Sequence, residues 1–168
     1  EAIKIVDFSS FFATAYGAKI LSDLGADVIK IEPLQGDPMR PLPDPFEASQ
    51  RGKRSLCIDL KSSEGQRIAQ ELARRADVVM HNLRPRKAER LGLGADQLRA
   101  LNPKLIYCYL PGWGSAGPKA HLKSFAPLLS GFCGLLYEGA GKGNPPVRGV
   151  MGNEDYYNGF LGALGVVL

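Results

Sequence analysis

The chain has 168 residues, 45% of them hydrophobic, and no apolar run approaches the roughly 20 residues of a membrane helix, so we expect one globular domain. Its 21 basic and 17 acidic residues give a net charge of +4 and are spread along the chain, which suits a small anionic ligand at least as well as nucleic acid. Cys57, Cys108 and Cys133 contain no CxxC pair, so they indicate neither a zinc site nor a disulfide framework and favour a reducing, cytoplasmic location.

From the amino terminus, short apolar runs alternate with helical patterns. Residues 3–8 predict a buried strand, residues 14–24 a helix that ends at Gly25, and residues 27–32 a second strand. A strand-helix-strand unit of this kind predicts parallel strands. The Pro- and Gly-rich residues 33–52 that follow predict a long loop, whose length suggests a binding segment or a cover.

The same alternation continues through the middle of the chain. Further strands are predicted at residues 54–60, 78–81 and 105–110, and helices from residue 62 or 63 to residue 76 and at residues 87–91 and 95–101. This pattern predicts a Rossmann-like α/β fold with an open, mostly parallel sheet and flanking helices.

The last third of the chain is richer in glycine. We expect a helix at residues 125–136, a flexible loop at residues 139–146, a short strand or extended segment at residues 147–151, and a helix at residues 155–168. The chain starts without Met and its last residue falls within an apolar run, so we expect it to be a piece of a longer protein.

Two common nucleotide-binding motifs are missing from the sequence. Residues 8–14, after the first predicted strand, contain no glycine, and Gly52-Lys53 lacks the spacing and the following Ser or Thr of a P-loop. Basic residues do lie at strand ends, where open α/β sheets bind ligands, and as a set they favour a polyanionic ligand, although each alone is explained as a surface charge. The set is Arg40, Lys53, Arg54, Lys61, Arg84, Arg86 and Arg90.

Two adjacent carboxylates, Glu154 and Asp155, stand where the last predicted helix begins. Asp is a preferred N-cap residue and an acidic side chain suits a helix N-terminus, so spacing alone leaves open whether Asp155 is structural or nucleophilic. His81 and His121 have no partner at metal-ligand spacing, so no metal site is expected. Cys108 lies in an apolar strand and is expected to be an inert buried thiol.

Several motifs occur in order along the chain: LGADVIKIE at residues 24–32, GDPMR at 36–40, RGKRSLCIDLKSSEG at 51–65, ADVVMHNLRP at 76–85, ERLGLG at 89–94, LNPKLIYC at 101–108 and GWGSAGP at 112–118. Together they resemble the amino-terminal half of the family III CoA-transferases, which include formyl-CoA:oxalate CoA-transferase, carnitine CoA-transferase and α-methylacyl-CoA racemase. The resemblance implies that residues 1–168 are the amino-terminal portion of a CoA-binding, Rossmann-like large domain, within a longer fold in which two subunits interlock.

The resemblance also implies a carboxylate nucleophile. In this family an aspartate attacks the acyl-CoA thioester to give a mixed anhydride, and the released thiolate converts the anhydride to an aspartyl-CoA thioester. The acceptor acid then repeats these steps in reverse. The family's aspartate opens a helix and is followed four residues later by Gly, a pattern that Asp155 and Gly159 fit and Glu154 does not.

The resemblance further implies where CoA binds. The implied positions are Arg40, Ile58, Lys61, Asn82, Leu83, Arg90, Lys123 and Phe125. Among them, Arg40 and Lys61 match contacts around the nucleotide end of CoA, and Ile58 matches an apolar position at the adenine pocket. Basic side chains suit this role because CoA carries three phosphates.

Two departures from the family pattern narrow the expected activity. Residues 12–15 replace a Gln-Ala-Gly-Pro-like turn of the formyl-CoA branch, so a formyl or oxalyl group is not favoured. Phe125 and Ala126 stand where the racemases carry a histidine base and an aspartate, so racemisation by that route has no base. A larger, apolar acyl group suits Phe11, Phe12 and Phe125.

We therefore expect an enzyme that transfers CoA between an acyl-CoA thioester and a carboxylic acid acceptor through Asp155. We expect it to act without a metal, as an interlocked homodimer or a heteromer with a related subunit, and to bind neither nucleic acid nor membranes. Two alternatives remain open. One is a CoA-thioester racemase, isomerase or lyase on the same scaffold, and the other is a non-catalytic CoA-binding subunit beside an active partner chain.

Overall fold

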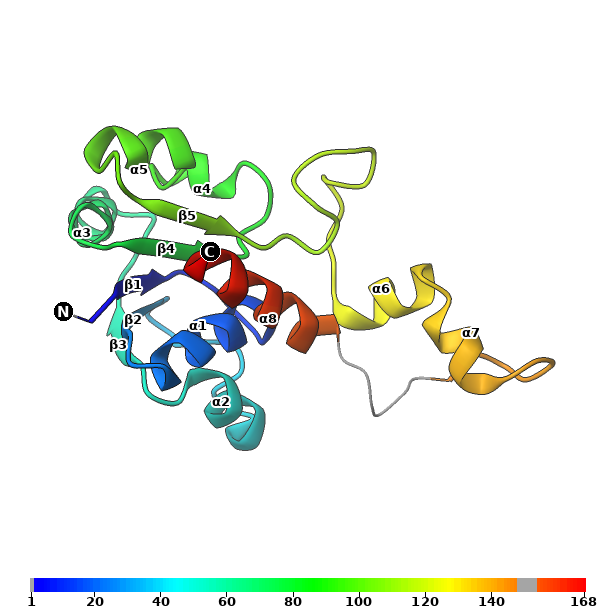
Figure 1. Ribbon diagram of the computed structural model, residues 1–168. Coiled ribbons are helices and arrows are strands. Elements are labelled where there is room, and N and C mark those ends of the chain that lie inside the picture. The colour runs from blue at the N-terminus through cyan, green and yellow to red at the C-terminus, as the bar shows by residue number, and fades with distance from the viewer. Residues whose placement is uncertain (1, 148–153) are drawn as a thin grey trace.

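The computed structural model describes residues 2–147 and 154–168. Within these residues a five-stranded sheet has the order β3-β2-β1-β4-β5, and all neighbouring strands are parallel (Figure 1). The strands are β1 (Lys4–Asp7), β2 (Asp27–Glu32), β3 (Arg54–Cys57), β4 (Val78–His81) and β5 (Ile106–Tyr109). The helices are α1 (Ala13–Asp23), α2 (Pro43–Gln50), α3 (Ser63–Arg74), α4 (Lys87–Arg90), α5 (Ala95–Leu101), α6 (Ala126–Phe132), α7 (Leu135–Ala140) and α8 (Glu154–Val167). This architecture confirms the predicted α/β fold.

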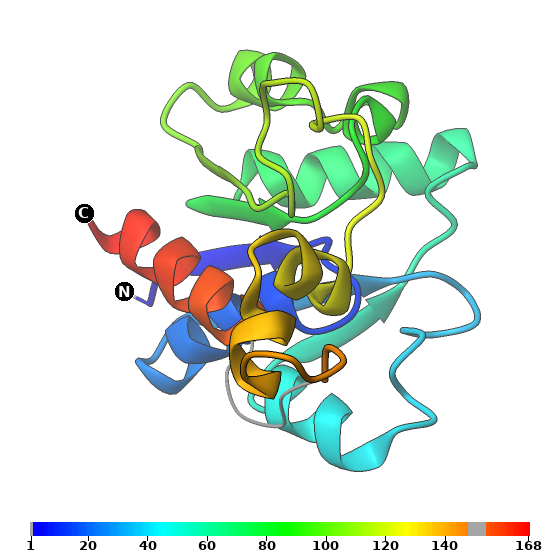
Figure 2. The same cartoon turned by 90° about the vertical axis from the view of Figure 1, so that its right-hand side faces the viewer.

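Side chains that alternate along the strands build a core on each face of the sheet. On one face Val6 and Val79 pack with buried residues of α3, α4 and α5. On the other face Ile5 and Val78 pack with buried residues of α1 and α8. Figure 2 shows α1 and α8 together on one side of the sheet and α3 on the other. The sheet is therefore covered by helices on both faces, as expected for parallel strands.

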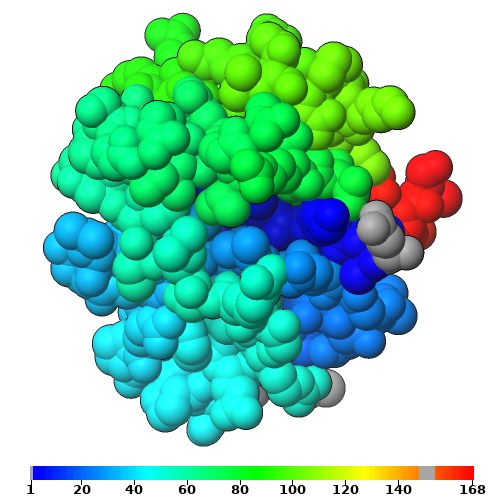
Figure 3. Space-filling view, turned by 90° about the vertical axis from the view of Figure 1, so that its left-hand side faces the viewer, coloured from blue at the N-terminus to red at the C-terminus, as the bar shows by residue number. Residues whose placement is uncertain are grey.

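The strand order reverses between β1 and β4, because the chain pairs β2 with one edge of β1 and later places β4 on the other edge. In open α/β sheets ligands bind at the carboxyl ends of the strands near such a reversal. Figure 2 looks onto these ends, where the segment after β5 and helices α6 and α7 lie in front of the sheet. Figure 3 shows the opposite face, where the first residues of the chain lie between its green and cyan parts.

Helix α2 corrects the prediction of a continuous loop over residues 33–52. A proline stands in the first turn of α2, where its missing N–H costs nothing, and Asp44 adds a negative charge to the same turn. Two of the prolines that suggested a loop, Pro43 and Pro45, therefore lie in the first turn of a helix.

The glycine-rich last third also differs from the prediction. The helix expected over residues 125–136 is two helices, α6 and α7, separated at Gly134, whose φ of 82° lies in the left-handed region that ends helices. Helix α7 extends to Ala140, into the predicted loop. Of the segment predicted to be extended at residues 147–151, residues 148–151 lie outside the described residues.

The strand predicted over residues 54–60 is shorter than expected. It ends at Cys57, and the chain then turns through residues 59–62 into α3. Ser62 caps this helix, since its Oγ accepts the N–H of Gly65 at 3.0 Å. The early turn leaves Ile58 and Lys61 in a loop at the end of β3, where they are free to line a ligand site.

Candidate functional site

Two cavities open at the carboxyl ends of the strands. The first, about 510 Å³, lies between the turn after β1, the turn after β4 and the segment after β5, and we call it the Lys123 cavity. The second, about 440 Å³, lies at the ends of β1, β2 and β3, and we call it the Ile58 cavity. Ser10, Leu83 and Lys87 line both cavities, so the two adjoin and form one recess.

This recess gathers most of the positions that the resemblance assigns to CoA. The Ile58 cavity is lined by Ile58, Lys61 and Leu83. The Lys123 cavity is lined by Asn82, Leu83, Arg90, Lys123 and Phe125. Arg40 and Asp155 line neither cavity. Residues far apart in the sequence thus meet at the carboxyl ends of the strands. The basic residues near the predicted strand ends had suggested a ligand site at this place.

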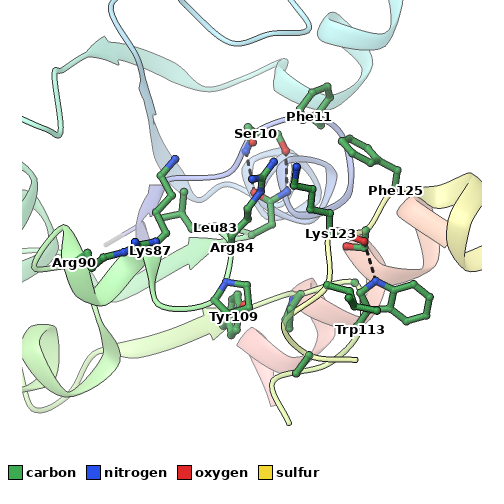
Figure 4. Close-up of a pocket in the computed structure, with 17 residues that line it drawn as sticks. Ser10, Phe11, Leu83, Arg84, Lys87, Arg90, Tyr109, Trp113, Lys123 and Phe125 are labelled. Atoms are coloured by element: carbon green, nitrogen blue, oxygen red, sulfur yellow. Dashed lines mark hydrogen bonds between the residues drawn. The ribbon is translucent and has the colours of Figure 1, made fainter. Parts of the chain in front are cut away.

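The side chains of the Lys123 cavity divide by chemistry. Lys87 and Arg90, from α4, lie on one side of it, and the rings of Phe11 and Phe125 lie on the other (Figure 4). The side chain of Lys123 lies between these two groups. A ligand with phosphates at one end and an apolar group at the other matches this division.

The amide of Asn82 ties the turn after β4 to the turn after β1. Its Oδ1 accepts the N–H of Ser10 at 3.0 Å, and its Nδ2 donates to the Ser10 carbonyl oxygen at 2.7 Å (Figure 4). The second N–H of the amide has no acceptor among the residues that the structure describes. Asn82 therefore positions both turns, in addition to any contact it makes with a ligand.

Arg40 is held by Glu32 at the edge of the Ile58 cavity. Its Nε and Nη2 donate to the Glu32 carboxylate at 2.7 and 2.6 Å. Burial alone would raise the pKa of Glu32, but hydrogen bonds to its carboxylate, led by those from Arg40, outweigh burial and lower the pKa to about 2. The guanidinium group has five N–H donors, so the pair leaves some of them for a phosphate.

Two buried ion pairs fix the strand ends around the Ile58 cavity. Lys30 Nζ lies 2.9 Å from an Asp37 oxygen and donates to the Ser9 carbonyl at 2.9 Å. Lys53 Nζ lies 2.8 Å from Asp7 Oδ2, and both side chains are at most 1% exposed. Lys53 is thus a structural cation, and the prediction that it belongs to the ligand-binding basic set is wrong.

Phe11 reaches the recess from an unusual backbone conformation. Its φ of 61° lies in the left-handed region, which bulky residues rarely adopt. Its ring lies 5.7 Å from the ring of Phe125 in an edge-to-face arrangement, and both side chains are exposed. Such strain costs about 1–3 kcal/mol and is concentrated at functional sites. The two rings therefore form the apolar end of the recess.

Helix α8 packs closely against α1 and so brings its first turn next to the turn after β1. A Cβ at Gly17 would lie 2.7 Å from the Gly159 carbonyl oxygen, a distance that only glycine allows. The ring of Tyr156 lies 4.9 Å from that of Phe12, edge to face. The spacing of one helical turn between Asp155 and Gly159 thus has a physical cause, because Gly159 provides the close contact that places the first turn of α8.

The two carboxylates in that first turn have different surroundings. Glu154 accepts a hydrogen bond from the Ser130 hydroxyl of α6. Burial raises the pKa of Asp155, and the neighbouring Glu154 charge adds to this effect. A carboxylate with a raised pKa is a stronger nucleophile, while the helix N-terminus stabilises its anion. The two acidic side chains in the first turn of α8 therefore differ in their surroundings.

Sequence reasoning did not single out Ser10, Lys87 and Trp113, which also line the Lys123 cavity. Lys87 stands in the helix after the turn that follows β4, so the strand-end rule could have found it. Ser10 acts through its backbone, and the Trp113 indole donates to the Lys123 carbonyl at 3.0 Å, so no residue pattern marks either. Arg54, a member of the predicted basic set, instead pairs with Asp27 at the start of β2.

Among residues 2–147 and 154–168, no group of three or more His, Cys, Asp and Glu side chains could hold a metal ion. Across the same two ranges, every helix is too short or too polar to span a bilayer. Burial raises the pKa of the Cys108 thiol to about 11, which agrees with the prediction of an inert thiol.

Comparison with known proteins gives consistent matches along the chain. The chain is 35% identical in sequence to the succinyl-CoA–L-malate CoA-transferase beta subunit of Chloroflexus aurantiacus, over 99% of this chain and 44% of that protein. It is 36% identical to the succinate–glutarate CoA-transferase of Agrobacterium fabrum, over 89% of this chain and 42% of that protein. The crystal structure of a hypothetical protein from Mycobacterium tuberculosis matches with a TM-score of 0.93 and 30% identity, over 99% of this chain and 49% of that one.

The chain thus spans less than half the length of these relatives. The family model described as CoA-transferase family III matches residues 1–168, the same region that carries the motifs and the parallel sheet. The resemblance found in the sequence is confirmed, and the chain belongs to CoA-transferase family III.

Proposed function

We propose that this protein is a CoA-transferase that moves CoA from an acyl-CoA thioester to a carboxylic acid. The observation that carries the proposal is that all the CoA positions implied by the sequence, except Arg40, line two adjoining cavities at the strand ends. The family membership and the names of relatives, which describe CoA transfer involving succinate, malate and glutarate, support it.

In this proposal residues 1–168 are the amino-terminal portion of a CoA-binding large domain. The nucleotide end of CoA lies in the Ile58 cavity, with Ile58 against the adenine and Lys61 near the phosphates. The pantetheine arm passes Leu83, which lines both cavities, towards Lys123 and Phe125. The distribution of charge supports this orientation of CoA. Lys87 lies where the two cavities meet, near the proposed phosphates, and the aromatic rings lie at the opposite end of the Lys123 cavity.

The proposed reaction proceeds through Asp155. A carboxylate oxygen of Asp155 attacks the thioester carbonyl carbon, the C–S bond breaks, and the CoA thiolate leaves with the electron pair, which gives a mixed anhydride. The thiolate then attacks the Asp155 carbonyl carbon, which forms aspartyl-CoA and releases the first acid as its carboxylate. The acceptor carboxylate attacks this thioester in turn, and the returning thiolate takes the new acyl group and frees Asp155. The raised pKa of Asp155, caused by burial and by Glu154, favours its attack.

The rings of Phe11 and Phe125 suggest which acyl groups fit. They meet edge to face beside the Lys123 cavity and are both exposed, so an apolar part of the acyl group would cover them. Neither Phe125 nor Ala126 can remove a proton, which argues against racemisation at this point.

We further propose that the active enzyme is built from two subunits, either identical or related. Large apolar side chains are exposed on helices α6, α7 and α8, among them Phe132, Leu135 and Leu161, and surfaces of this kind are usually covered by another chain or segment. Relatives named as alpha and beta subunits support the heteromeric form. A cytoplasmic location, expected from the unpaired cysteines, belongs to the same proposal.

The experiment that tests the function uses the full-length protein with an acyl-CoA and an acceptor acid. Asp155→Asn should lower kcat by at least about a thousandfold and leave CoA affinity nearly unchanged, because only the nucleophile is removed. Glu154→Gln is the matched control, one residue away in the same helical turn, and should keep kcat within about tenfold of the parent.

Three outcomes separate the alternatives. Parent turnover in Asp155→Asn would contradict the role of Asp155. A parent protein that binds CoA but exchanges none with any acid would support the non-catalytic subunit instead. Product formed from acyl-CoA without an acceptor acid would indicate an isomerase or lyase.

A further inference from the structure

A third cavity, of about 550 Å³, adjoins the Lys123 cavity, and we call it the His81 cavity. It is enclosed by the ends of β4 and β5, by α4 and by the segment 115–121. Tyr109 and Arg84 line both this cavity and the Lys123 cavity (Figure 4). None of the residues assigned to CoA lines the His81 cavity, so the proposed reaction gives this cavity no role.

His81 gives this cavity a buried donor. The side chain is 4% exposed, and its Nδ1 accepts the N–H of Leu83 at 3.2 Å. Because burial lowers the pKa of His81 to about 4, the ring is neutral near pH 7 and its proton sits on Nε2. Nε2 is buried, and within residues 2–147 and 154–168 it has no hydrogen-bond partner. A donor in this state calls for an acceptor.

Tyr109 adds a second group of the same kind. It is the strand partner of His81, and the two rings stack with centroids 4.6 Å apart at an angle of 15°. The Tyr109 hydroxyl is buried and, in the described part of the chain, unpaired. Tyr107, two residues earlier on the same face, differs because its hydroxyl donates to the Leu93 carbonyl at 2.9 Å. One tyrosine hydroxyl is thus satisfied by the fold, and the other is left beside the cavity.

The charges around the cavity favour an anion. The guanidinium groups of Arg84 and Arg86 line it, opposed by the carboxylate of Glu89, so the wall is positive on balance. No ion pair formed among the described residues includes Arg84 or Arg86. Neutral buried donors next to unpaired guanidinium groups are the usual means of holding a carboxylate or phosphate.

We propose that the His81 cavity binds a small oxyanion, a carboxylate or a phosphate group, which accepts hydrogen bonds from His81 Nε2 and the Tyr109 hydroxyl and is balanced by Arg84 and Arg86. None of the residues assigned to CoA lines this site, although Tyr109 and Arg84 also line the neighbouring Lys123 cavity, and Asp155 does not line it. The proposal of an anion site therefore does not depend on the proposed transferase activity.

The test is a titration followed by nuclear magnetic resonance of the histidine rings. Only two histidines occur in the chain, His81 and His121, and a His121→Gln variant assigns them. Sodium acetate and sodium phosphate are added separately, with sodium chloride at equal ionic strength as the reference. The proposal expects a saturable shift of His81 Nε2 with at least one of the two probes, and the one that acts identifies the chemical class.

Two tyrosine variants form a matched pair. Tyr109→Phe removes the unpaired hydroxyl and should weaken binding of the active probe about tenfold, the effect of losing a hydrogen bond to a charged group. Tyr107→Phe removes the satisfied hydroxyl and should leave the affinity unchanged while lowering the melting temperature. If Tyr109→Phe does not fold, Arg86→Gln, which alters an exposed side chain, should weaken binding several-fold through loss of charge.

Three results would overturn the proposal. In the first, neither probe shifts His81 Nε2 beyond the chloride reference. In the second, Tyr109→Phe or its substitute Arg86→Gln binds as tightly as the parent. In the third, saturating CoA abolishes the shift, which would show that the anion and CoA occupy overlapping sites.

Discussion

Two regions of the molecule are built in different ways. The sheet side, formed by the ends of β1, β2 and β3, is held by buried ion pairs such as Asp7 with Lys53. The second region, which we call the helical side, consists of α6, α7 and α8. It exposes large apolar side chains, and α6 and α7 bury none of their described residues. Figure 1 shows α6 and α7 extending away from the sheet. The sheet side is held in place by its own buried contacts. The helical side has exposed apolar surface, so its structure depends on what packs against it.

The largest effect should come from breaking the sheet side at Lys53. Lys53→Met leaves the buried Asp7 carboxylate without its partner, which should lower the free energy of unfolding by about 3–5 kcal/mol. The control is Arg54→Met, the next residue, whose pair with Asp27 is exposed and should contribute less than about 1 kcal/mol. Urea unfolding measures both, and equal losses would mean that the sheet side is not locked by buried pairs.

The contact between α1 and α8 joins the two sides and should be the next most sensitive. Gly159→Ala places a Cβ 2.8 Å from the Ala13 carbonyl oxygen, and overpacking of this kind costs about 1–3 kcal/mol. Gly165→Ala, in the same helix with open space at its Cβ, should instead raise stability by about 0.5–1 kcal/mol through helix propensity. A stabilising Gly159→Ala would show that α8 does not rest closely on α1.

Acid should weaken the sheet side through Glu32. Its pKa of about 2 in the folded protein lies below the ordinary 4.5, so its contribution is complete above about pH 4.5 and is lost as the pH falls towards 2. Because Arg40 is partly exposed, we expect about 2 kcal/mol from this pair. Urea unfolding at several pH values should show that Glu32→Gln loses correspondingly less stability on acidification. If the variant and the parent lose equal free energy of unfolding on acidification, Glu32 does not contribute to the acid sensitivity.

The smallest effect should come from the helical side itself. Leu128 in α6 is 54% exposed, so Leu128→Ser should change the free energy of unfolding of this chain by no more than about 0.5 kcal/mol. In the full-length protein the same variant should weaken subunit association, measured by sedimentation. A loss of several kcal/mol in the isolated chain would show that α6 is already packed there.

Much of the fold could be predicted because short apolar runs alternate with helical patterns. Strands β2 and β4 have the predicted bounds, since β4 is a compact run of mainly apolar residues and β2 has β-branched residues at three of its six positions. Helix α2 was missed because its prolines resemble those of a loop, although proline is favoured in a first turn. The break at Gly134 depends on a left-handed backbone angle that the residue type allows but does not require.

The site could be predicted only where side chains themselves carry the signal. Lys61 and Lys123 were found through motifs that resemble a known family, and both line the recess. The burial of Lys53 could not be seen, because its partner Asp7 lies 46 residues away in the sequence. Ser10 joins the site through its backbone N–H and carbonyl, which no side-chain pattern reveals.

The central claim is that Asp155 becomes covalently linked to CoA during turnover. The direct measurement is to mix the full-length protein with acyl-CoA, quench with hydroxylamine or borohydride, and map the modified peptide by mass spectrometry. We expect an acyl-CoA-dependent hydroxamate or alcohol at Asp155, with Glu154 unmodified and with no modification in Asp155→Asn. Modification at another residue, or full transfer activity without any modified peptide, would contradict it.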